Sequence, residues 1–63
     1  MKIMILLDLL IFEDKDNEVV KEHIKEHGLN HFIHKNKLHV KGTKQDLFFM
    51  LYDLSHEFDI ELM

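Results

Sequence analysis

Two histidines one helical turn apart have the spacing in this sequence that most directly suggests metal chemistry. His23 and His27 are four residues apart, which on a helix places both imidazoles on one face, as in a pair of metal ligands. A third ligand is needed, and His31 or a carboxylate could supply it. The segment reads HIKEH, so its glutamate is not where the HExxH motif has it. We therefore favour the alternative, in which both rings border the core and no metal or other cofactor is bound.

A carboxylate and an imidazole form a second candidate site. Asp8 belongs to an apolar segment that is predicted to be a central strand, and His39 belongs to a segment predicted to lie beside it. A carboxylate next to an imidazole can orient it as a general base or can bind a divalent metal. The alternative is that Asp8 is a partly exposed acid that limits aggregation of the sheet.

A stripe of aromatic residues on the second predicted helix forms a third candidate site. Thr43 to Asp46 resembles a capping box, and the helix should continue to about Glu57. One face carries a core stripe with helical spacing: Leu47, Met50, Leu51, Leu54 and Phe58. The roughly opposite face carries Gln45, Phe49, Tyr52 and His56, with Phe48 at its border. Exposed aromatic rings are favoured at partner sites, so we predict that another protein binds this stripe.

The face of the predicted sheet that the helices leave uncovered is a fourth candidate site. The alternation of the strands places six residues there: Met4, Leu6, Asp8, Phe32, His34 and His39. This face is half apolar, and a second copy of the chain could cover it. A homodimer is a route by which so short a chain can complete its burial.

The order of predicted elements that positions these residues is β-α-β-β-α-β. Lys2 to about Phe12 forms a strand, although its leucines also permit a helix. A helix capped by Asp14 or Asp16 runs to His27 and ends at Gly28. Residues 30–34 and 37–41 form a hairpin that pairs Phe32 with His39, and residues 59–63 form the last strand. We predict one domain, residues 1–63, with an α+β ferredoxin-like two-layer sandwich: an antiparallel sheet in the order 4-1-3-2 with both helices on one face.

This order of elements, together with the segment Met1 to Asp8, resembles the ferredoxin-like family of small CRISPR-associated endoribonucleases. The resemblance implies a nuclease that uses Asp8. The sequence has no arginine, however, and its two glycines are too few for a glycine-rich phosphate loop. We therefore predict a binding module and not an enzyme.

The composition restricts the class of protein and its partners. The formal net charge is −4, which disfavours nucleic acid as the main partner. No apolar run reaches the roughly 18 residues of a membrane span, and the run Ile3–Phe12 is followed by acidic residues and not by a signal cleavage site. The chain lacks cysteine, which excludes disulfides and thiolate metal sites. We expect a cytoplasmic protein.

The function that we predict is that of a small acidic protein-interaction module. The chain is rich in lysine, isoleucine and asparagine, and contains no arginine, alanine or proline, which indicates AT-rich coding. A phage or mobile-element protein that binds and inhibits a host macromolecule fits this origin. The surfaces for it are the second helix, the open sheet face, or both. The alternative hypotheses are a histidine-rich metal-binding domain and a small nuclease that uses Asp8.

Overall fold

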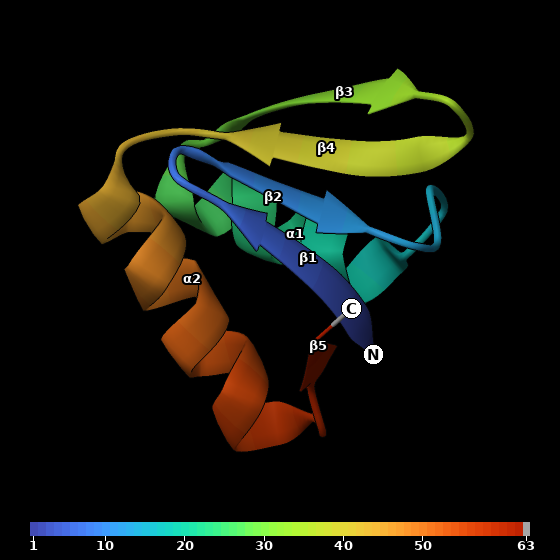
Figure 1. Ribbon diagram of the computed structural model, residues 1–63. Helices are drawn as coiled ribbons and strands as arrows, with labels where there is room; N and C mark the ends of the chain where they lie inside the picture. The colour runs from blue at the N-terminus through green and yellow to red at the C-terminus, as the bar shows by residue number, and fades with distance from the viewer. Residues whose placement is uncertain (63) are drawn as a thin grey trace.

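The apolar N-terminal segment folds as a hairpin and not as the single strand that we predicted. In the computed structural model, which describes residues 1–62, β1 (Lys2–Leu6) and β2 (Leu9–Phe12) pair in antiparallel fashion around the turn Leu7-Asp8 (Figure 1). The whole segment fully extended, at about 3.3 Å per residue, would be about 36 Å long. The longest dimension of the fold is 25 Å, so the other strands could not cover a strand of that length.

The two helices and the remaining strands follow in the order α1 (Glu18–His27), β3 (Asn30–His34), β4 (Lys37–Lys41), α2 (Lys44–Glu57) and β5 (Glu61–Leu62). One sheet contains all five strands in the order β3-β4-β2-β1-β5. Every pair is antiparallel except β1 and β5, which are parallel. The prediction of a four-stranded antiparallel sheet is therefore wrong. The N-terminal hairpin reverses the chain direction between β2 and β1, and β5 consequently meets β1 in parallel.

The first helix ends at the predicted glycine, but it begins at a different cap from the ones predicted. The predicted caps Asp14 and Asp16 both precede the true cap, Asn17, whose side-chain oxygen accepts a hydrogen bond from the Val20 amide at 3.2 Å. Asp14 instead accepts from the amide of Asp16 at 2.9 Å and so shapes the turn before the helix. Gly28 ends the helix with φ of 66°, the left-handed conformation that favours glycine.

The second hairpin has the predicted register. Lys35 and Asn36 form its turn with φ of 51° and 66°, the conformation of a type I′ turn, which matches the twist of the flanking strands. Phe32 pairs with His39, as predicted. This register therefore determines on which face of the sheet each β3 side chain lies.

The core lies between one face of the sheet and both helices. Strands β1, β2 and β4 direct alternate side chains into it, and each helix contributes one stripe. The buried residues are Ile3, Leu10, Phe12, Val20, Ile24, Leu38, Val40, Leu47, Met50 and Leu54. Leu51 and Phe58 were predicted to join them, but Leu51 is only partly buried and Phe58 is 40% exposed. It caps α2 in an extended conformation, so its side chain no longer follows the helical stripe.

The last strand is short and pairs with the start of the chain. The amide of Glu61 donates to the carbonyl of Met1 at 2.7 Å, and the N-terminal amine donates to the carbonyl of Asp59 at 2.9 Å. The predicted strand included Met63, which lies outside the described residues. Neither helix within residues 1–62 is long and apolar enough to cross a membrane.

Candidate docking groove

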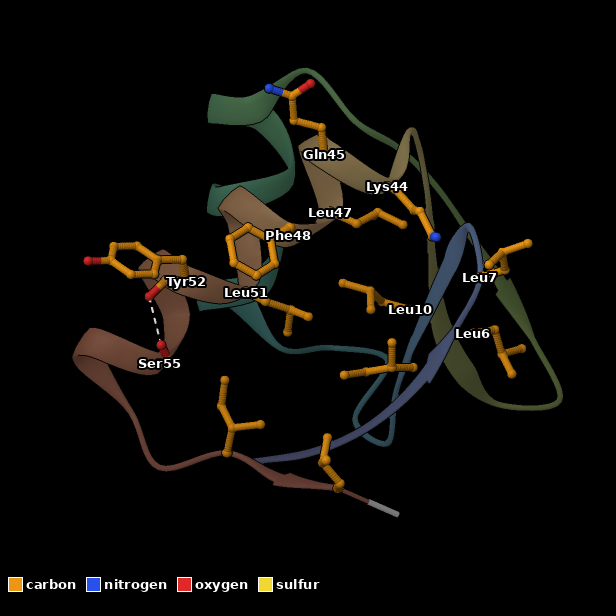
Figure 2. Close-up of a pocket in the computed structure, with 13 residues that line it drawn as sticks. Leu6, Leu7, Leu10, Lys44, Gln45, Leu47, Phe48, Leu51, Tyr52 and Ser55 are labelled. Atoms are coloured by element: carbon orange, nitrogen blue, oxygen red, sulfur yellow. Dashed lines mark hydrogen bonds between the residues drawn. The ribbon is translucent and has the colours of Figure 1, made fainter.

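An open apolar groove separates α2 from the N-terminal hairpin (Figure 2). Its volume is about 1040 Å³. The hairpin, the helix and the last strand each contribute to its walls. The lining residues are Ile5, Leu6, Leu7, Leu10, Lys44, Gln45, Leu47, Phe48, Leu51, Tyr52, Ser55, Ile60 and Leu62.

The groove exists because α2 is anchored along one stripe only. Leu47, Met50 and Leu54 bury that stripe in the core. The adjacent stripe, which includes Phe48 and Leu51, faces the hairpin across open space (Figure 2). On the hairpin side, Ile5 pairs with Leu10 on the sheet face that bears the helices.

The groove side chains are apolar and yet largely in contact with solvent. Leu7 is 74% exposed, Phe48 63% and Leu62 70%, whereas Leu10 at the floor is only 1% exposed. Single exposed apolar residues are normal on protein surfaces, but contiguous ones mark interaction sites. The groove is therefore a concave surface on which exposed apolar side chains are contiguous.

The polar groups of the groove do not form a catalytic arrangement. Lys44, Gln45 and Ser55 are its polar lining residues apart from the phenol of Tyr52. The Ser55 hydroxyl donates to the carbonyl of Tyr52 at 2.8 Å, so it is engaged within the helix. A general base such as histidine or a carboxylate is not among the lining residues of the described chain. The geometry suits binding of an apolar group and offers no nucleophile paired with a base.

The predicted aromatic stripe of α2 is divided between two surfaces. Gln45, Phe48 and Tyr52 line the groove, whereas Phe49 and His56 do not. The rings of Tyr52 and His56 meet edge to face with centroids 4.3 Å apart.

Residues of the N-terminal hairpin and of β5 complete the groove and were missed from the sequence. Ile5 and Leu7 were both placed inside the single predicted strand. Ile60 and Leu62 were assigned only to the last strand. The signal that could have revealed the groove is Asp8, a polar turn-forming residue within an apolar run, because it marks the hairpin.

The sheet face opposite the helices, which we call the outer sheet face, has a row of cross-strand neighbours. Met4 lies opposite Ile11, Ile11 opposite His39, and His39 opposite Phe32. The His39 ring stacks on Phe32 with centroids 4.9 Å apart and meets the His34 ring edge to face at 5.6 Å. Its Nδ1 donates to the carbonyl of Lys37 at 3.1 Å. These contacts leave His39 only 8% exposed although it is on the uncovered face.

One of the residues predicted for the outer sheet face, Asp8, lies elsewhere. Asp8 is in the β1–β2 turn and not on a strand beside His39, whose neighbours in the sheet are Ile11 and Phe32. The proposed pair of carboxylate and imidazole is therefore not formed, because the strand that should present Asp8 has already turned back. Leu6, at the end of β1, alternates with Ile5 and so shares the outer sheet face with Met4 as predicted, and it also borders the groove.

The three histidines considered as metal ligands are not brought together. His31 is on the edge strand β3, whereas His23 and His27 lie on α1 and face α2. His27 Nε2 donates to the Asp53 carboxylate at 2.9 Å, and His23 Nδ1 donates to the Val19 carbonyl at 2.9 Å. Residues 1–62 contain no group of three side chains that could hold a metal ion. The two α1 histidines instead link the helices.

No family model, curated protein or solved structure matches the chain. The function is therefore inferred from the surfaces of the molecule alone. Exposed apolar side chains lie in the groove, on the outer sheet face and on the outer side of α2, and the groove gathers several of them in one concave surface.

Adding zinc should leave the melting temperature of the protein unchanged. A metal that binds the folded state would raise it by mass action, but His27 is already engaged with Asp53 and a third ligand is missing from the described part of the chain. Thermal unfolding followed by circular dichroism, with and without one equivalent of Zn²⁺, measures this. A rise of several degrees at one equivalent, lost in His27→Ala, would restore the metal hypothesis.

Proposed function

We propose that this chain is a protein-interaction module that binds an amphipathic helix of another protein in the groove between α2 and the N-terminal hairpin. The observation that supports this proposal is the continuous apolar lining of the groove, most of which is in contact with solvent. An amphipathic helix inserts side chains at i, i+3, i+4 and i+7 into such a groove and keeps its polar face in water.

A helix suits the groove better than a small molecule does. Small-molecule sites enclose most of the ligand surface and fix it with a few directed polar groups. Here Leu7, Phe48 and Leu62 are more than half exposed, so a small ligand would remain largely in water. An amphipathic helix would cover these side chains with its apolar face and keep its polar face in water.

The charge of the chain indicates the chemistry of the partner helix. The formal net charge is −4. Asp8 and Asp59 are sequence neighbours of the lining residues Leu7 and Ile60, and Lys44 is the only cationic residue among the lining residues. A helix with lysine or arginine beside its apolar stripe complements this distribution, which speeds association and excludes acidic competitors.

We also propose that the fold is a variant of the ferredoxin-like sandwich in which the first strand is replaced by a hairpin. If β1 and β2 are counted together as strand 1, then β3, β4 and β5 become strands 2, 3 and 4. The observed order β3-β4-β2-β1-β5 then corresponds to the order 4-1-3-2 of that sandwich, and this supports the proposal. A cytoplasmic inhibitor of a host protein, encoded by a phage or mobile element, is the setting that fits the small size, the acidic charge and the AT-rich composition.

A peptide titration tests the proposed function. The peptide has about 15 residues, long enough to form a helix on binding, with leucines in an i, i+3, i+4, i+7 stripe and lysines elsewhere. The control peptide has the same composition with the leucines spread around the helix. We expect the striped peptide to shift the NMR signals of Ile5, Leu10 and Leu51 in the isotopically labelled protein, with saturation, and to leave those of Phe32 and Phe49 in place. Equal shifts from both peptides, or none from either, would refute the proposal.

A further inference from the structure

The edge strand β3 has the features of a surface that pairs with another strand. All five of its residues are exposed, and it forms the free edge of the sheet beyond β4 (Figure 1). Natural edge strands are usually protected by lysine, proline, a bulge or a covering loop. The sequence of β3, Asn-His-Phe-Ile-His, contains no lysine, acid or proline, and it includes the exposed side chains of Phe32 and Ile33.

The backbone groups of β3 that face outward can be identified from its register. In an antiparallel ladder, hydrogen-bonded and non-hydrogen-bonded pairs alternate. The pair that flanks the two-residue turn, His34 with Lys37, is hydrogen-bonded in a hairpin of this type. Phe32 with His39 is then the next hydrogen-bonded pair, so the amide and carbonyl groups of His31 and Ile33 point away from β4 toward solvent.

We infer that two copies of this chain dimerise by antiparallel pairing of β3 with β3 around a two-fold axis at Phe32. In this register His31 of one copy lies opposite Ile33 of the other. The outward amide and carbonyl groups of both residues then form hydrogen bonds across the two-fold axis. Phe32 then lies opposite its own copy in a non-hydrogen-bonded pair, the geometry in which side chains are closest. The interface is isologous, which is the usual arrangement of a dimer.

Three features of this pairing suit a second copy of the chain. The pairing places no like charges opposite each other, since β3 carries no lysine, aspartate or glutamate, whereas such pairs destabilise a sheet. The two Phe32 rings meet as an aromatic cross-strand pair, which stabilises a sheet. The row Met4, Ile11, His39 and Phe32 then continues across the axis into the same row of the second copy.

The dimer leaves the groove of each copy free. β3 is at one edge of the sheet, and the groove is lined by β1 and β5 at the other. The dimer would therefore present two grooves, and its formation does not depend on the proposed function. One strand pair buries less than the roughly 800 Å² per partner of a standard interface, so we expect a reversible dimer.

A charge-exchange experiment tests this register. We expect the sedimentation coefficient of the wild-type protein to rise with concentration, whereas Phe32→Lys and Phe32→Glu should each remain monomeric because like charges meet at the axis. An equimolar mixture of the two variants should form a heterodimer. The backbone amides of His31 and Ile33 should exchange more slowly in the wild-type dimer than in either variant alone.

Three results would overturn the inference. They are a wild-type protein that stays monomeric at all concentrations, variants that dimerise as well as the wild type does, and a mixture of variants that stays monomeric. Circular dichroism confirms that each variant is folded before it is compared. If a variant does not fold, Ile33→Pro replaces it, because this proline removes an outward amide that β4 does not use.

Discussion

Phe12→Ala is expected to unfold a large part of the protein population at room temperature. Phe12 is 1% exposed, and its neighbours across the sheet are Ile3 and Leu38, which are also buried. Truncating a buried phenylalanine costs about 3 to 5 kcal/mol in the free energy of unfolding, since the lost contacts leave a cavity. A domain of this length has a total stability of about 3 to 9 kcal/mol.

Urea denaturation followed by circular dichroism measures this loss. Phe58→Ala is the matched control, because it removes the same side chain from a position that is 40% exposed at the end of α2. We expect the control to lose about 1 kcal/mol or less. Equal losses in the two variants would mean that Phe58 belongs to the core, as its spacing in the sequence suggested.

Phe48→Ala is expected to weaken binding of the striped helical peptide at least about 30-fold, which corresponds to the 2 kcal/mol of an aromatic residue central to an interface. Phe48 lines the groove and is 63% exposed, so its side chain gains most of its burial only when a partner binds. For the same reason the variant should be about as stable as the wild type.

Phe49→Ala is the control for this second prediction. Phe49 is the next residue on the same helix, is also exposed, and does not line the groove. Isothermal titration calorimetry should give it an affinity within about threefold of the wild type, a difference of less than 1 kcal/mol. If the two variants bound equally weakly, the docking surface would be the outer side of α2, which includes His56, and not the groove.

Short-range patterns in the sequence were enough to predict much of the local structure. The turn Lys35-Asn36 set the register of β3 and β4, because a two-residue loop leaves one way to pair the flanking strands. Gly28 and Thr43 marked a helix end and a helix start through backbone groups only a few residues away. The spacing of Leu47, Met50 and Leu54 identified the buried stripe of α2.

The candidate site was only partly predictable for a physical reason. Gln45, Phe48 and Tyr52 were selected from the face of one helix, and all three line the groove. Phe49, on the same predicted stripe, lies outside it. Which side of an outward stripe borders a groove depends on where the neighbouring element lies, and helical periodicity contains no such information.

The sequence by itself determined the helices, the second hairpin and the buried stripe of α2, since each depends on residues close together in the chain. Only the tertiary structure decided that the apolar N-terminal run is a hairpin. That run is apolar on both faces, so apart from Asp8 its pattern contains nothing that marks the reversal at Leu7-Asp8. The length of the sheet and the pairing of β1 with β5 favour the hairpin. The same reversal of the chain moves Asp8 away from His39 and forms one wall of the groove.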